Sequence, residues 1–179
     1  MRELCLHILD IAANSVSAGA DKISITIDEN LKDDTLTIEI ADNGKGMSPE
    51  TVKQVMDPFT TSRTDREVGL GIPLLKFAAE SSNGWLTMNS ELGKGTKVSV
   101  QFQHSHIDRM PLGNITDTLL SLQLCSPDVN WIFSVRKNGK EFYFDDKEFK
   151  NELDGIPLTD PNVIRFIRNL FEEGVQEIQ

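Results

Sequence analysis

Carboxylate and amide side chains fall at a few positions where they could contact a polar ligand. Asp10 and Asn14 are four residues apart in a segment with helical periodicity, so both lie on one face of the predicted helix. Asp42 follows an apolar alternation typical of a strand and precedes the glycines Gly44 and Gly46. Glycine in such a loop lets backbone N–H groups approach a phosphate closely, so phosphate binding is the chemistry that this pattern suggests.

Two further glycine clusters follow along the chain. Gly69-Leu70-Gly71 opens a predicted helix, and Gly93-x-Gly95-Thr96 precedes a predicted strand. A helix that begins at a glycine loop adds the positive end of its dipole to a phosphate site. Taken alone, Gly69 and Gly71 are weak evidence, because glycine is common in ordinary turns. The order and spacing of all these groups together favour a nucleotide site over a set of plain turns.

The periodicity of apolar residues predicts the elements that position these groups. Helices are expected over residues 3–18 and 48–55 and after the Gly69–Gly71 turn, and strands over residues 23–27, 36–40, 85–90 and 96–102. Residues 57–67 are polar, rich in Thr and Arg, and without a period, which predicts a surface loop. We therefore expect an α/β layer of four or more strands with helices, complete near residue 103.

The second part of the chain predicts a smaller α+β segment. Helices are expected over residues 115–124, 147–153 and 161–173, and strands over 129–135 and 141–144 around the turn at Asn138-Gly139. Six aromatic residues at strand or helix spacing are expected to form its core: Trp131, Phe133, Phe142, Phe144, Phe166 and Phe171. We predict two domains, residues 1–104 and a C-terminal extension over residues 105–179 that contacts a partner or a second copy.

The composition excludes several classes of protein. Lys and Arg number 18 against 28 Asp and Glu, a net charge of −10, which disfavours binding to nucleic acid or to an anionic membrane. The chain lacks an apolar run of spanning length and a signal-peptide pattern, so we expect a cytoplasmic protein. Cys5 and Cys125 lack the spacing of a zinc site, and we expect two reduced thiols.

The four motifs in this order resemble the GHKL ATPase superfamily, which includes gyrase-type topoisomerases, the chaperone of ninety kilodaltons, histidine kinases and MutL. The resemblance covers about residues 2–102. It implies the Bergerat nucleotide-binding fold, an α+β sandwich in which helices cover one face of a mixed sheet. The opening, the loop region and residues 106–113 are also similar to small stand-alone ATP-binding proteins of anaerobic bacteria.

The resemblance implies ATP and Mg²⁺ as ligands and assigns roles to residues. Asn14 matches the asparagine whose side-chain oxygen binds the Mg²⁺ that bridges the ATP phosphates, since hard cations prefer oxygen ligands. Asp42 matches the aspartate that accepts a hydrogen bond from the adenine amino group. Gly46 matches the glycine that permits close approach to the base, and Thr96 matches the threonine that completes adenine recognition. Gly44 and Met47 belong to the same motif.

The segment Asp57-Pro58-Phe59-Thr60-Thr61 resembles the entrance of the nucleotide lid in the kinase and anti-sigma branches. Gly69 and Gly71 match glycines whose backbone holds phosphate, with Leu70 between them. Arg63 and Arg66 could pair with the triphosphate, and solvated loop arginines are the competing interpretation. The lid residues expected to contact nucleotide are Phe59, Thr60, Thr61, Arg63 and Arg66.

Asp10 occupies the position where hydrolytic members of the superfamily carry a glutamate as general base. Its side chain is one methylene shorter, so it could act as a base through a shifted backbone or a water, and a structural role is the alternative. Three functions remain open: an Mg-ATP-dependent switch with slow hydrolysis, an anti-sigma-type protein serine/threonine kinase, and a sensor that binds ATP or ADP without turnover. A histidine autokinase is disfavoured because no phosphoacceptor domain precedes the first motif.

Overall fold

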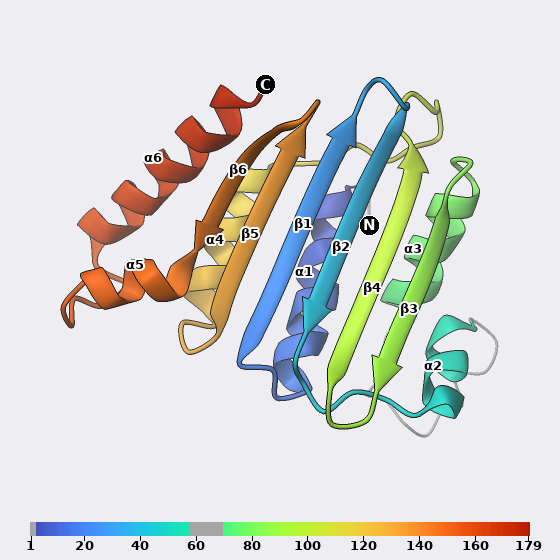
Figure 1. Cartoon of the computed structure of the whole chain (residues 1–179), viewed down its shortest axis with the longest axis horizontal. Coiled ribbons are helices and arrows are strands. Elements are labelled where there is room, and N and C mark those ends of the chain that lie inside the picture. The colour runs from blue at the N-terminus through green and yellow to red at the C-terminus, as the bar shows by residue number, and fades with distance from the viewer. Residues whose placement is uncertain (1–2, 58–69) are drawn as a thin grey trace.

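A computed structural model describes residues 3–57 and 70–179 of the chain (Figure 1). The helices are α1 (Leu4–Ser17), α2 (Pro49–Met56), α3 (Gly71–Glu80), α4 (Ile115–Cys125), α5 (Asp146–Glu152) and α6 (Pro161–Glu177). The strands are β1 (Lys22–Asn30), β2 (Thr35–Asp42), β3 (Trp85–Glu91), β4 (Gly95–Gln103), β5 (Asn130–Lys137) and β6 (Lys140–Asp145). Each of these elements was expected from the sequence, and the bounds differ by a few residues.

The strands form one six-stranded mixed sheet in the order β3-β4-β2-β1-β5-β6. β1 lies in its interior, antiparallel to β2 with Ile25 opposite Ile40, and parallel to β5 with Ile25 opposite Phe133. The other neighbouring strands pair antiparallel. The sequence boundary predicted after residue 104 falls at the end of β4, yet β5 and β6 continue the same sheet instead of forming a separate layer.

A row of helices covers one face of this sheet, and the core lies between the two layers (Figure 1). The inward residues of the strands are branched or aromatic and alternate with polar ones, the pattern of a half-buried sheet. Helix α1 covers the middle of the sheet and packs against α3 on one side and α4 on the other. This arrangement confirms the expected α+β fold with helices on one face.

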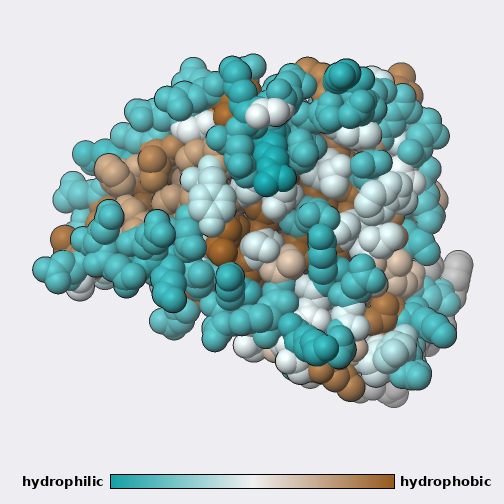
Figure 2. All heavy atoms as spheres, viewed as in Figure 1, coloured by the Kyte–Doolittle hydropathy of each residue, from teal (hydrophilic) through white to brown (hydrophobic). Residues whose placement is uncertain are grey.

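The opposite face of the sheet is open and mainly hydrophilic (Figure 2). Ion pairs and hydrogen bonds run between its strands: Lys97 pairs with Glu39 at 2.9 Å, and Arg136 pairs with Glu141 at 3.0 Å. Because these groups are well exposed, each pair contributes little to stability, on the order of 0–1 kcal/mol. The polar alternation therefore explains why this face needs no covering layer.

The segment between β4 and α4 holds the N-terminal end of α1. The backbone N–H of Leu4 donates to the carbonyl of Pro111 at 3.0 Å, and that of Cys5 donates to the carbonyl of Leu112 at 2.9 Å. No side chain caps this helix, so these bonds satisfy N–H groups that the first helical turn cannot pair internally. The position of α1 thus depends on the second part of the chain.

Aromatic side chains form the core of the C-terminal part, as expected, with one exception. Phe171 makes edge-to-face contacts with Phe133 and Phe144, at centroid distances of 5.8 and 5.0 Å. Phe166 is 57% exposed, so its assignment to the core was wrong. Phe166 and Phe171 are five residues apart, about 140° around a helix, and therefore cannot share a face.

Cys5 is buried and Cys125 is exposed, and both are free thiols. None of the helices in residues 3–57 and 70–179 combines the length and apolar composition needed to cross a bilayer.

Candidate functional site

A cavity of about 490 Å³ opens between α1, α2, α3 and the ends of β2 and β4. Its wall is mixed, as expected for a small-molecule site, with several polar groups set among apolar side chains. The polar side chains are Asn14, Ser15, Ser17, Asp42, Lys45, Thr51 and Thr96. The apolar ones include Ile11, Ile40, Met47, Val55, Ile72, Met88 and Val98.

The carboxylate of Asp42 is held in place at the end of β2 by three hydrogen bonds. Oδ1 accepts from the backbone N–H groups of Gly44 at 2.9 Å and Thr96 at 3.2 Å. Oδ2 accepts from the Ser15 hydroxyl at 2.5 Å. A carboxylate oxygen offers about two acceptor positions, so Oδ2 keeps one for a ligand. Asp42 is therefore a fixed acceptor at the cavity wall, with one acceptor position of Oδ2 free for a ligand.

Gly46 and Gly95 bring two loops into close contact beside Asp42. Both have positive φ, +66° for Gly46 and +113° for Gly95. A Cβ on Gly46 would lie 1.9 Å from the carbonyl oxygen of Glu91, and one on Gly95 would lie 1.9 Å from that of Asp42. Only glycine fits either position, so both residues are required for the shape of the cavity mouth.

Replacing Gly46 by alanine is expected to lower the free energy of unfolding by about 2–4 kcal/mol, combining positive-φ strain with overpacking. Gly93→Ala is the matched control, because Gly93 has φ +75° but nothing within 4 Å of the added Cβ. The control should lose only the strain, about 1–2 kcal/mol. Urea unfolding measures both variants, and equal losses would contradict the close contact at Gly46.

Ser90 links the glycine loop to the strand that carries Thr96. Its hydroxyl accepts from the Met47 N–H at 2.8 Å, donates to the Gly95 carbonyl at 3.0 Å and lies 2.8 Å from the Thr96 hydroxyl. Sequence reasoning missed Ser90 and Ser15, because a serine in a strand or helix carries no signal of its partners. Adjacency to Asn14 was the one available hint for Ser15.

Helix α1 presents Asn14 and Asp10 toward the same end of the molecule. Asn14 is exposed and lines the cavity. Asp10 is half-buried one turn earlier, where its Oδ2 would lie 1.9 Å from a Cβ on Gly71, the first residue of α3. Asp10 therefore contacts the start of α3. Leu70 is 55% exposed beside it.

The structure places most of the predicted residues in one region. Asn14, Asp42, Gly46, Met47 and Thr96 line the cavity, and Gly44 binds Asp42 through its N–H. Asp10, Leu70 and Gly71 lie at the α1–α3 contact. The remaining predicted residues lie outside the described part of the chain: Phe59, Thr60, Thr61, Arg63, Arg66 and Gly69.

The donor set fits an adenine nucleotide with a hard metal ion. The spare acceptor on Asp42 suits an exocyclic amino group, and the apolar wall suits a flat base. The Asn14 amide offers the oxygen ligand that Mg²⁺ prefers. Lys45, which sequence reasoning did not assign, adds one positive charge to the wall.

Comparison with known proteins identifies the family to which the first part of the chain belongs. Residues 1–106 match the family model described as histidine kinase-, DNA gyrase B-, and HSP90-like ATPase. Sensor protein SrrB of Staphylococcus aureus is 37% identical over 101 residues, which are 54% of this chain and 17% of SrrB. The chain thus spans less than a fifth of the length of the curated relatives that it matches.

Two solved structures are similar to this chain at low sequence identity, and the first of them shows the same fold. The N-terminal domain of a DNA repair protein has a TM-score of 0.55 and 17% identity, over 80% of this chain and 52% of that chain. The MutL ATPase domain of Aquifex aeolicus, solved with ADP, has a TM-score of 0.45 and 16% identity, over 86% and 68%. Since the family model covers more than half of the sequence, the chain belongs to the histidine kinase-, DNA gyrase B- and HSP90-like ATPases, with its ATP-binding domain in residues 1–106.

Proposed function

We propose that the protein is a cytoplasmic Mg-ATP-dependent switch that hydrolyses ATP slowly. The observation that carries the proposal is the Asp42 carboxylate, held by Ser15, Gly44 and Thr96 with one acceptor position left at the cavity wall. That acceptor would take the adenine amino group, and a base without an amino donor would leave it unpaired. Such unpaired groups are the usual source of strong selectivity.

The phosphates would lie toward Asn14 and the start of α3. Asn14 would hold Mg²⁺ through its side-chain oxygen, and the bound ion would supply charge neutralisation to the phosphates. At the start of α3 the N–H groups of Gly71 and Ile72 have no acceptor within the helix and favour an anion, whereas Pro73 has no N–H and Leu74 donates to the Leu70 carbonyl. Lys45 contributes a further positive charge at the cavity wall.

Asp10 is the proposed general base. It lies one helical turn before Asn14 on α1, and its carboxylate is in contact with Gly71 at the start of α3. From there it can accept a proton from a water molecule that attacks the terminal phosphate. The Asp10 side chain is one methylene shorter than glutamate, so the proton would pass to it through an intervening water. Slow turnover is the expected consequence.

Asp10→Asn is expected to bind a non-hydrolysable ATP analogue as the wild type does, because the adenine contacts are unchanged. Its phosphate release should fall by about a hundredfold or more, the usual contribution of a general base. Asp10→Glu is the conservative control and should keep measurable release. A phosphate assay with the analogue titration alongside measures both quantities; unchanged release by Asp10→Asn would exclude Asp10 as the base.

The same assay separates the alternative functions. If the label from γ-labelled ATP appears on a protein and not in free phosphate, the activity is that of a protein serine/threonine kinase and not of a hydrolase. Binding of ATP without either product would indicate an ATP or ADP sensor.

A protein partner or a second copy would bind through the C-terminal part of the chain. Helix α4 in this part packs against α1, and residues 111–112 hold the N-terminal end of α1.

A further inference from the structure

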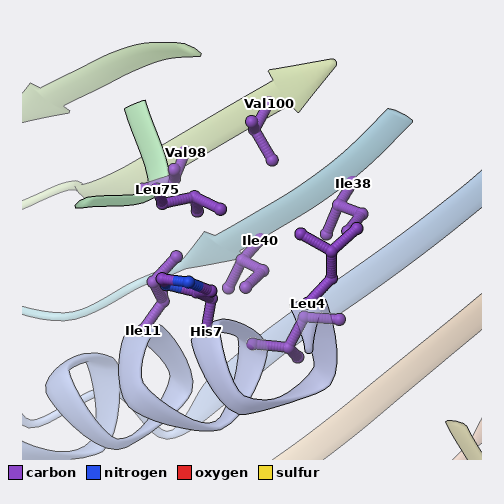
Figure 3. A pocket seen from close by; sticks show the side chains of 9 residues that line it. Leu4, His7, Ile11, Ile38, Ile40, Leu75, Val98 and Val100 are labelled. Atoms are coloured by element: carbon purple, nitrogen blue, oxygen red, sulfur yellow. The ribbon is translucent and has the colours of Figure 1, made fainter. Parts of the chain in front are cut away.

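The nucleotide cavity has an aliphatic wall on the side of the core. Behind this wall lies a second, much smaller cavity of about 10 Å³, beneath α1 and between β2, β4 and α3 (Figure 3). The two cavities share the lining residues Ile11, Ile40 and Val98, and Figure 3 shows these side chains around the smaller cavity. None of the three side chains can form a hydrogen bond with a base. Polar recognition of a base therefore depends on other parts of the wall, which include Asp42 and Thr96.

The hydroxyl group of Ser90, on β3, uses every hydrogen-bonding position that it has. It donates its hydrogen to the Gly95 carbonyl at 3.0 Å, and it accepts a bond from the Met47 N–H at 2.8 Å. A hydroxyl group has one donor and two acceptor positions. Only an acceptor position is therefore left for the Thr96 hydroxyl, which lies 2.8 Å away. The hydrogen of this last bond must come from Thr96.

Thr96 consequently faces the cavity as an acceptor. Its side chain lines the cavity, and its backbone N–H donates to Asp42 Oδ1 at 3.2 Å. Because its hydroxyl hydrogen is directed to Ser90, its oxygen offers a ligand acceptor positions alone. Ser15 is in the same state, since it donates its hydroxyl hydrogen to Asp42 Oδ2 at 2.5 Å. The two hydroxyl groups that lie beside the Asp42 carboxylate can thus accept from a ligand but have no hydrogen to donate to it.

This set of acceptors distinguishes two kinds of purine. The exocyclic amino group of adenine has two N–H donors, so one could bind Asp42 Oδ2 and the other the Thr96 hydroxyl oxygen. Hypoxanthine, the base of ITP, has a carbonyl oxygen in place of the amino group. That oxygen would face Asp42 and Thr96 without a hydrogen between them. A site that leaves its polar groups unpaired with the wrong ligand rejects that ligand strongly.

We propose that Ser90 is a positioning residue of the ATP site, which takes the hydroxyl hydrogen of Thr96 and so makes Thr96 an acceptor for the amino group of adenine. The inference rests on the proposed function, because it names the residue that sets the base selectivity of the same site. Ser90 is not among the described residues that line the cavity, so it acts through Thr96. Without Ser90, the Thr96 hydrogen is free to turn toward the ligand.

Calorimetry of the full chain with the non-hydrolysable imido analogues of ATP and ITP measures this selectivity. In Ser90→Ala the freed Thr96 hydroxyl can donate to the carbonyl oxygen of the ITP analogue. The ratio of the affinity for the ATP analogue to that for the ITP analogue should therefore fall about tenfold, the equivalent of one hydrogen bond. Ser90→Thr keeps the hydroxyl group and should keep the wild-type ratio.

Ser24→Ala is the matched control for Ser90→Ala. Ser24 is also a half-buried serine in a strand, and its hydroxyl also donates to a backbone carbonyl, that of Ala41 at 3.4 Å. No hydrogen bond joins it to Thr96 in the described part of the chain. Ser24→Ala should therefore bind both analogues as the wild type does.

Removal of the Thr96 hydroxyl tests the route by which Ser90 acts. Thr96→Val has nearly the same shape and should bind the ATP analogue about tenfold more weakly, because one acceptor for the amino group is lost. It should not weaken binding of the ITP analogue. Adding Ser90→Ala to Thr96→Val should leave the affinity ratio unchanged, since no hydroxyl hydrogen remains to be redirected.

An unchanged ratio in Ser90→Ala, or a further fall of the ratio when Ser90→Ala is added to Thr96→Val, overturns the role of Ser90 and leaves the proposed function standing. Weaker binding of the ITP analogue by Thr96→Val overturns it too, because Thr96 would then be a donor in the wild type. This last result needs no change at Ser90, so it decides the point even if Ser90→Ala does not fold. Absence of ATP-analogue binding by the wild type overturns the proposed function itself, so the two failures are distinguishable.

Discussion

Asp42→Asn is expected to weaken the binding of ATP about a hundredfold or more while leaving the fold intact. The amide oxygen can still accept from Gly44 and Thr96, as the Oδ1 atom does now. The amide NH₂ would stand where Oδ2 meets Ser15, and it would turn a donor toward the adenine amino group. Loss of a charge-assisted acceptor and a buried unpaired group cost about 3 kcal/mol, which corresponds to that factor.

Equilibrium dialysis with labelled ATP measures the effect, and thermal unfolding checks the fold. Ser99→Ala is a suitable control, because Ser99 lies on the neighbouring strand β4 and binds Glu39 on the open face instead of a cavity residue. It should bind ATP as the wild type does. Retention of full affinity by Asp42→Asn would place the adenine elsewhere.

Deletion of residues 105–179 is expected to abolish cooperative folding of the remaining ATP-binding domain. β1 would lose its parallel partner β5 along eight residue pairs, from Lys22 opposite Asn130 to Glu29 opposite Lys137. The fully buried rings of Trp131 and Phe133 would be missing from the core. α1 would also lose the carbonyls that cap its N-terminal end. Since a domain is stable by only about 5–15 kcal/mol, these losses together should exceed the margin.

Circular dichroism and thermal unfolding of the fragment 1–104 beside the full chain provide the measurement. Phe133→Ala in the full chain tests the same interface more gently, with an expected loss of about 3–5 kcal/mol. A fragment that unfolds in a sharp transition near the temperature of the full chain would mean that the predicted boundary divides two independent units.

The local spacing of apolar residues was sufficient to predict the helices and strands. It did not predict which strands pair with one another. The apolar spacing from Leu4 to Val16 and the alternation of Ile23, Ile25 and Ile27 lie in α1 and β1, as expected. Nothing in that alternation says that β5 would pair with β1, because periodicity reports which face is buried and not which strand is adjacent. The C-terminal strands were therefore assigned to a separate α+β extension, without a prediction of the strand they would pair with.

In the candidate site, too, residues that match a motif were predicted and residues that only support them were not. Asp42, Gly46 and Thr96 were predicted because their types and spacing match a family motif, and the structure brings them to one cavity. Ser15 and Ser90 were not predicted, since their role is the support of another side chain across the fold.

The central claim is that the cavity beside Asp42 binds Mg-ATP, and one titration tests it most directly. Calorimetry of the full chain with a non-hydrolysable ATP analogue, with and without Mg²⁺ and beside the guanine analogue, reports affinity, metal dependence and base selectivity together. The account predicts one site per chain, tighter binding with Mg²⁺ and a clear preference for adenine. Absence of binding, or equal affinity for the guanine analogue, would contradict it.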